Sequence, residues 1–202
     1  MEYTRLDRMI DVMFTAARDV ESVVSDAGAE TEIEKQEEER LTDSNQKEKG
    51  VWQFTEASVL HEKRTRILSA VSRTLDVAFV KKSRPQFWDA THKDRLICTI
   101  SKRYETKGSH PYWYAYHPQW HEFLSEGSKG FLALGCVDLA SAFLIPPAAT
   151  MASALDFLNT TTKDDGQIYW HLHIAERAAD TYQLLLPKKS SSLDLGDFRL
   201  NI

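Results

Sequence analysis

The spacing of hydrophobic residues divides the 202-residue chain into a helical N-terminal part and a strand-rich remainder. Apolar side chains recur at three- and four-residue steps over residues 1–27 and again over residues 55–79, and this spacing predicts an amphipathic helix in each range. Residues 28–54 are rich in charged side chains, which predicts an acidic linker. The apolar stripe of the first helix has no partner in that linker, so we expect it to pair with a second copy or to dock on the C-terminal domain.

From residue 86 onward the pattern changes to short strands. "DRLICTISKRYE" alternates in polarity, "PYWYAYH" is aromatic throughout, and "GFLALGCVD" and "SAFLIP" are apolar runs of strand length. "PAATMASALDFLNTTT" predicts a helix that ends in a turn, and "IYWHLHIAE" with "TYQLLLPKK" predicts a hairpin. The order predicts an α+β domain over residues 55–202, with a mixed or mainly antiparallel sheet in its sheet-rich part, 86–202, and helices packed to one side.

One stretch, "HPYWYAYHPQWHEF", contains six aromatic residues and three histidines among fourteen. On a strand, Tyr112, Tyr114 and Tyr116 point to one face, while Trp113 and His117 point to the other. The tyrosine row can stack nucleic-acid bases or pack in the core. Core packing is the commoner outcome for aromatic residues in strands, and we expect it here.

The histidines do not form a recognisable metal-binding pattern. Pro118 lies between His117 and His121, so these two side chains need not share a face, whereas His171 and His173 share one strand face. A zinc or iron site needs further ligands at defined spacing, and none is dictated here. We expect no bound transition metal.

No catalytic motif is complete in the chain. There is no G-x-S-x-G elbow, no Gly-rich phosphate loop and no H-E-x-x-H, so we expect no cofactor, and magnesium only if the protein is a nuclease. Cys98 and Cys136 lie in apolar runs, which predicts reduced core thiols.

Charge is distributed unevenly, although the net charge is only −5. Residues 1–50 hold 14 Asp and Glu against 7 Lys and Arg, whereas residues 61–107 hold 12 Lys and Arg against 5 Asp and Glu. No run of about 18 apolar residues and no signal peptide is present, so we expect a cytoplasmic protein that does not bind membranes.

The basic segment predicts contacts with a nucleic-acid backbone, and two aromatic residues beside it are candidates for base stacking. The candidate phosphate ligands are Arg64, Arg66, Lys81, Lys82, Arg84, Lys93, Arg95, Lys102 and Arg103, and the candidate stacking residues are Trp88 and Tyr104.

The stretch "FWDATHKDRLICTISKRYE", with "YWYAYHP" and "SAFLIP" after it, resembles the core of the restriction-endonuclease-like PD-(D/E)xK superfamily. In that family an Asp and a Glu or Gln hold magnesium, and a Lys two residues further on assists the attacking water. The resemblance implies Asp89 and Lys102 as the Asp and the Lys, but Ile100 stands where the middle carboxylate belongs. The resemblance implies either a nuclease whose carboxylate has moved to Glu105 or Asp138, or an inactive relative that keeps only the binding surface. The third alternative is that the resemblance is a coincidence of pattern.

Three functions therefore stay open. The first is a nucleic-acid-associated binding module in regulation or defence, and the second is an oligomeric protein-interaction adaptor that pairs through its N-terminal helix. The third is a metal-dependent nuclease of the PD-(D/E)xK type. Basic side chains in a continuous groove would favour the first, and basic side chains bonded to acidic neighbours would favour the second.

Overall fold

The computed structural model describes residues 57–104, 110–146 and 150–202. Apart from residues 82–84, these belong to one compact unit, Phe54–Lys81 and Pro85–Ile202. The helix over residues 1–27 and the linker over residues 28–54 lie outside the described residues, so self-association through that helix stays a prediction. No helix in the described ranges is long and apolar enough to cross a membrane.

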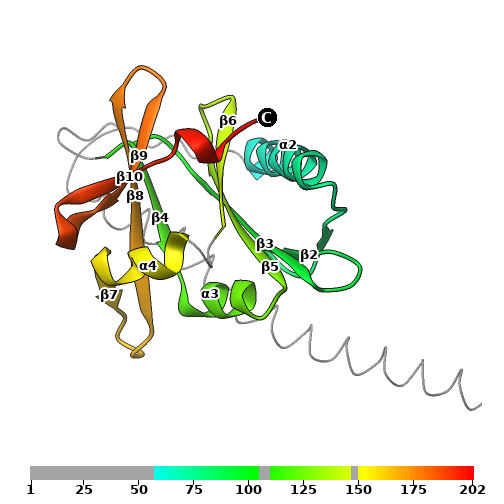
Figure 1. Cartoon of the computed structure of the whole chain (residues 1–202), viewed down its shortest axis with the longest axis horizontal. Helices are drawn as coiled ribbons and strands as arrows, with labels where there is room; N and C mark the ends of the chain where they lie inside the picture. Colours follow the sequence, from blue (N-terminus) through cyan, green and yellow to red (C-terminus); the bar gives the residue numbers. More distant parts are fainter. Residues whose placement is uncertain (1–56, 105–109, 147–149) are drawn as a thin grey trace, which may run out of the picture. The chain divides into compact units, whose positions relative to one another are not determined.

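Two β-sheets form the unit (Figure 1). Sheet A consists, in spatial order, of β1 (Val80–Lys81), β2 (Gln86–Trp88), β3 (Asp94–Ser101), β5 (Lys129–Cys136), β6 (Ser141–Ile145) and β11 (Arg199–Asn201). Sheet B consists of β10 (Ser191–Asp194), β9 (Thr181–Leu186), β8 (Ile168–Ala178) and β4 (Tyr112–Tyr116), and β7 (Thr160–Thr162) also pairs with β8. Neighbouring strands are antiparallel except for the parallel pair β3 and β5. The α+β prediction is confirmed, although the strands divide between two sheets rather than one.

Each face of sheet A packs against a different layer. Helix α2 (Ala57–Leu75) buries Ile67 and Val71 on one face, against Leu96 and Cys98 of β3. Ile97, which points to the opposite face, belongs to the larger core that sheet A shares with sheet B. Strand β3 therefore carries apolar side chains on both of its faces, because both faces are covered. Cys98 and the second cysteine, Cys136, are free and buried, as expected.

The segment between β6 and β8 is helical in its first described part and forms a strand where a turn was predicted. Its described residues begin with a π-helical turn at Thr150 and Met151 and continue through α4 (Ala152–Ala154) and the 3₁₀ turn η2 (Leu155–Phe157), followed by β7. The threonines of β7, expected in a turn, are β-branched and pair with Ile168–Trp170 of β8. Helical turns therefore occupy the described part of the predicted helix as far as Phe157, and only the predicted turn at the threonines was wrong, because they form a strand.

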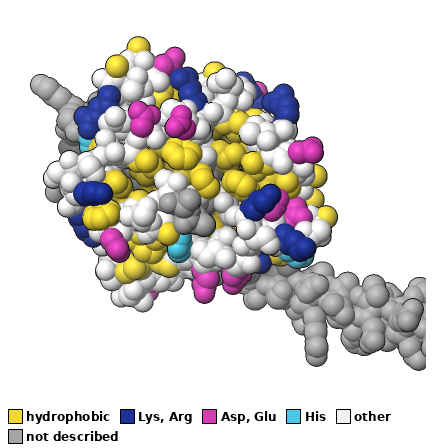
Figure 2. All heavy atoms as spheres, in the orientation of Figure 1, with side chains coloured by type: hydrophobic (Ala, Val, Ile, Leu, Met, Phe, Trp, Pro, Cys, Tyr) yellow, Lys and Arg dark blue, Asp and Glu magenta, His cyan; other side chains and the backbone are white. Residues whose placement is uncertain are grey.

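Short elements complete the unit. Helix α3 (Pro118–Ser125) has proline in its first turn, and 3₁₀ turns η3 (Pro187–Lys189) and η4 (Gly196–Phe198) flank β10. Figure 2 shows hydrophobic side chains gathered across the middle of the face on which α4 and the C-terminal segment lie in Figure 1. Partly buried residues around the two-sheet core, among them Leu155 and Phe198, pack against it.

Gly130, near the start of β5, lies against the backbone of α3. A Cβ atom at this position would stand 2.5 Å from the carbonyl oxygen of Leu124, which cannot move without disturbing the helix. We expect Gly130→Ala to lower the free energy of unfolding by about 1 to 2 kcal/mol, measured by urea denaturation. Lys129→Ala, at the exposed neighbouring position, is the control, and equal stability of the two variants would contradict the close approach.

Candidate functional site

The three tyrosines of β4 pack in the core. Tyr112, Tyr114 and Tyr116 are all buried between the sheets, so the prediction of core packing is confirmed. The Tyr114 hydroxyl donates a hydrogen bond to the Gly135 carbonyl oxygen at 2.9 Å. Burial holds the pKa of Tyr114 well above its usual range, and the ring next to it in sequence, Trp113, points the other way. The tyrosine row is therefore not available to stack bases.

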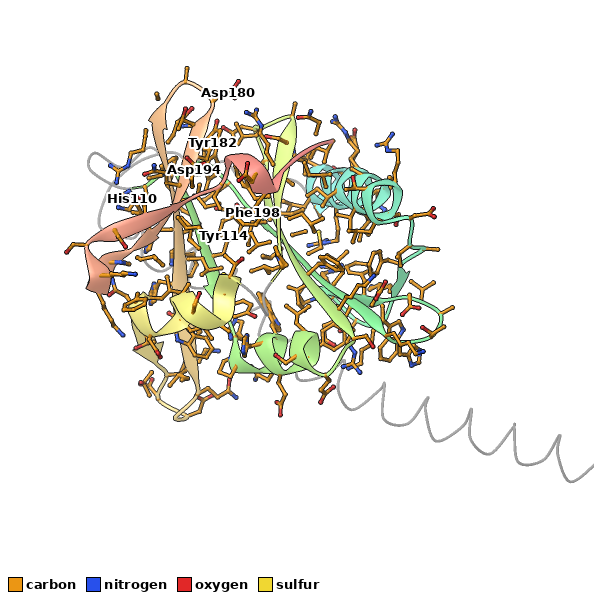
Figure 3. The ribbon with its side chains drawn as sticks, in the orientation of Figure 1. His110, Tyr114, Asp180, Tyr182, Asp194 and Phe198 are labelled. Carbon is orange, nitrogen blue, oxygen red and sulfur yellow. The ribbon has the colours of Figure 1, made fainter. Side chains whose placement is uncertain are left out.

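The opposite face of sheet B carries a second group of rings, here called the aromatic face. The strand register places Trp113 beside His173 on this face. Ring contacts extend the group along β8 and onto His110, two residues before β4. The ring centroids of His110 and His173 are 5.6 Å apart, and those of Trp113 and Tyr169 are 6.4 Å apart. Figure 3 shows Tyr114 between the sheets and His110 on the other side of sheet B. The aromatic face consists of His110, Trp113, Tyr169, His171 and His173.

The histidines of the aromatic face favour the uncharged form. Burial, helped by the neighbouring His110 and His171, lowers the pKa of His173 to about 4. Burial also lowers the pKa of His171, and burial together with the charge of Arg177 lowers that of His110. All but Tyr169 are partly exposed. At neutral pH the aromatic face thus offers uncharged, partly exposed rings.

Cationic side chains flank the aromatic face. Arg177 of β8 donates from Nε to the Gln183 side chain at 3.3 Å and is close enough to act on His110. At the start of β4, the Tyr104 N–H donates to the Pro111 carbonyl oxygen, and Lys102 lies over the Tyr104 ring at 5.3 Å. Two of the predicted nucleic-acid ligands, Lys102 and Tyr104, are therefore neighbours of the chain segment that carries His110.

Arg103, another predicted phosphate ligand, bonds to two carboxylates. Its Nε donates to Asp138 at 2.7 Å and its Nη2 to Glu176 at 2.8 Å, which links the end of sheet A to β8 of sheet B. The Tyr112 hydroxyl also donates to Asp138, at 3.0 Å, and the Tyr182 hydroxyl donates to Glu176 at 3.2 Å. We call Arg103, Asp138 and Glu176 the arginine bridge. Burial on its own would raise the pKa of Asp138. The hydrogen bonds from Arg103 and Tyr112 outweigh burial, so the pKa of Asp138 lies below its ordinary value.

The remaining basic candidates lie on α2, on β1 to β3 and on the segments that join them. Arg95 donates to Glu126 at 2.5 Å, and Arg66 donates to the Ile202 carbonyl oxygen at 2.9 Å. Lys81 and Lys93 are exposed. The rest are Arg64, whose Nε is buried, and Lys82 and Arg84, which lie between β1 and β2.

Trp88 lies at the end of β2, in sheet A. Its ring stacks on the ring of His92, with centroids 3.8 Å apart and planes 19° apart. One face of the indole is therefore covered by the protein's own His92 ring, so less of the Trp88 ring surface is open to a base than the sequence suggested.

The residues implied by the nuclease resemblance are not brought together. Asp89 precedes β3 and Lys102 follows it, and an eight-residue strand keeps its ends about 23 Å apart. The Asp89 carboxylate accepts hydrogen bonds from the Thr91 side chain and from the N–H groups of Lys93 and Asp94, which lower its pKa to about 2. Ile100 packs in the core beneath α2.

The two candidates for a moved carboxylate have different outcomes. Glu105 lies outside the described residues, and Asp138 is held in the arginine bridge. Within the described ranges, no group of three or more His, Cys, Asp or Glu side chains is arranged to hold a metal ion.

A small cleft opens beside the β8–β9 hairpin. It has a volume of about 230 Å³ and is lined by Asp180, Tyr182, Asp194 and Arg199, among others. Figure 3 labels the first three. Two of these lining residues bond to each other, since Arg199 donates to the Asp180 carboxylate at 2.9 Å.

Sequence reasoning did not name the aromatic face as a site. The signal was present, because His171 and His173 were placed on one face of their strand and Trp113 on the outward face of its own. Nothing in the sequence stated that these two strands are neighbours. Comparison of the chain with models of protein families, with curated proteins and with solved structures finds no match in any of the three.

Proposed function

We propose that this protein binds nucleic acid and that the aromatic face of sheet B holds unpaired bases of a single strand. The observation that carries the proposal is a group of partly exposed, uncharged rings on the outer face of a sheet, with Arg177 at its border. Bases stack on such rings with little sequence preference, and nearby cations attract the backbone.

The geometry favours a single strand over a duplex. Stacking needs bases whose faces are open, and in a duplex the neighbouring base pairs cover those faces. The rings of His171 and His173 are nearly parallel, with planes 9° apart and centroids separated by 6.1 Å. This row runs along β8 and gives successive bases more than one ring to contact.

We expect Trp113→Ala to weaken binding of a single-stranded oligonucleotide by roughly 1 to 3 kcal/mol, because a stacking ring is lost. Fluorescence anisotropy with labelled homopolymers of DNA and RNA at low salt measures the affinity. Arg177→Glu should also weaken binding, and the wild-type log-log salt slope should be about −2 for three phosphate contacts on a single strand.

Matched variants on sheet A locate the interface. Trp88→Ala removes a ring and Lys129→Glu reverses an exposed charge, both away from the aromatic face. Binding should survive both changes. If these variants weaken binding and the changes at Trp113 and Arg177 do not, the aromatic face is not the interface. If no oligonucleotide binds at low salt, the proposed function is wrong.

A second candidate is the oligomeric adaptor. Arg95 is bonded to Glu126, and Arg103 is bonded to Asp138 and Glu176, so part of the basic segment is neutralised within the domain. Light scattering of the full chain and of a version starting near Gly50 tests it. Equal oligomeric states would exclude self-association through residues 1–27.

A further inference from the structure

A chain of hydrogen bonds crosses the aromatic face from β4 to β7. The Trp113 indole Nε1 lies 3.0 Å from Nδ1 of His171, and the other ring nitrogen of His171, Nε2, lies 2.7 Å from the Thr161 hydroxyl oxygen. The three side chains come from three adjacent strands, since β4 and β7 both pair with β8. The chain therefore connects the ring that we propose for stacking to the threonine at the border of the sheet.

The direction of each hydrogen bond follows from the donors available. An indole N–H can only donate, so Nδ1 of His171 must accept and carries no proton. The imidazole is then neutral, its proton is on Nε2, and Nε2 donates to Thr161. A protonated His171 would point an N–H at the indole N–H and could not make this bond.

The surroundings favour the neutral ring. Burial disfavours a charge on His171. The hydrogen-bond partners of the ring, Trp113 and Thr161, do not titrate in this range. The rings of His173 and Tyr169, both on β8, contact the His171 ring. Further out lie His110, which contacts His173 and is close to the charge of Arg177, and His117, which contacts Tyr169. The histidines and the arginine among these can only add positive charge, which opposes protonation of His171.

We infer that His171, held in one tautomer by Thr161, is the positioning residue that orients the Trp113 ring for base stacking. This inference rests on the proposed function, because it concerns the same face. Its consequence is that the stacking surface is assembled only while His171 is uncharged. Acid should release the indole and weaken the contact with bases, although it adds positive charge that attracts phosphates.

The test separates stacking from charge by using an uncharged probe, an oligomer of bases on a methylphosphonate backbone. Wild-type affinity for this probe should be constant from pH 8 to pH 7 and should fall at least about fivefold once acid protonates His171, at a pH below the ordinary histidine pKa because burial lowers the pKa of this ring. His171→Gln keeps a carbonyl acceptor for the indole and an N–H donor for Thr161 but does not titrate. It should bind the probe with a flat pH profile.

Thr161 provides a second variant with a conservative control. Thr161→Val removes the acceptor for Nε2 and should weaken probe binding at pH 7.5, whereas Thr161→Ser keeps the hydroxyl and should restore it. A wild-type profile that is flat, or one that keeps its slope in His171→Gln, overturns the inference.

A measurement without ligand distinguishes the two proposals. The Trp113 indole N–H resonance in a ¹⁵N-labelled protein, assigned with Trp113→Phe, should shift with pH in wild type and stay constant in His171→Gln. A resonance that does not titrate overturns the inference even if nucleic acid binds. A titrating resonance without binding of any oligonucleotide supports the hydrogen-bond chain and overturns the proposed function.

Discussion

Replacing Arg103 by alanine is expected to lower the free energy of unfolding by about 2 to 3 kcal/mol. The change leaves Asp138 and Glu176 without their shared cation where the two sheets meet, and losing one partner of a buried ion pair costs about 3 to 5 kcal/mol. We use a smaller figure because the Arg103 side chain is 34% exposed, so water screens part of the charge. Urea denaturation at pH 7 measures the effect.

Arg199→Ala is the matched control, since it also removes an arginine that bonds to a carboxylate of the β8–β9 hairpin. Its partner Asp180 is 73% exposed, and a surface pair of this kind contributes less than about 1 kcal/mol. Equal losses in the two variants would contradict the structural role of the arginine bridge. An Arg103 variant with wild-type stability would return Arg103 to the candidates for phosphate binding.

Acid is expected to destabilise the domain by about 1 to 2 kcal/mol between pH 6.5 and pH 4, through the histidines of the aromatic face, a figure reduced because His173 is partly exposed and water screens its charge. The pKa of His173 is about 4 in the folded protein, against about 6.5 when unfolded. Between these values the unfolded chain binds a proton that the folded chain does not, so stability falls as the pH falls. His110 and His171 act in the same direction, because their pKa values are also lowered.

Urea denaturation at unit pH steps from 8 to 4 measures this slope. His173→Gln removes the most strongly shifted group and should flatten the profile over the same range, while His61→Gln on α2 is the matched control. A slope that His173→Gln leaves unchanged would show that another group is responsible.

Loss of the hydrogen bonds to Asp138 should add a further decline in stability below about pH 4, because the pKa of that carboxylate is lowered by folding.

Local alternation predicted the faces of single strands correctly. Tyr112, Tyr114 and Tyr116 are buried on one side of β4, and His171 shares its side of β8 with His173, because side chains in a strand alternate whatever the strand pairs with. Helix α2 also lies within the range of its hydrophobic pattern.

The features that the sequence did not predict depend on contacts between residues far apart in the chain. Arg103 reaches carboxylates 35 and 73 residues further along the chain, and no local pattern relates these positions. The division of the strands into two sheets has the same origin, since β3 and β4 are consecutive in sequence but belong to different sheets. The threonines of β7 had the composition of a turn, and pairing with β8 made them a strand.

The parallel pairing of β3 with β5 has a consequence for how the domain folds. Between these two strands the chain leaves sheet A, forms β4 of sheet B and then α3, and returns. Sheet A also receives its last strand, β11, from residues 199–201, after the strands of sheet B have all been passed. Neither sheet can therefore be completed as a separate unit. We expect a high contact order, slow folding and a single cooperative transition, with sheet A unfinished in a nascent chain until residue 201 is available.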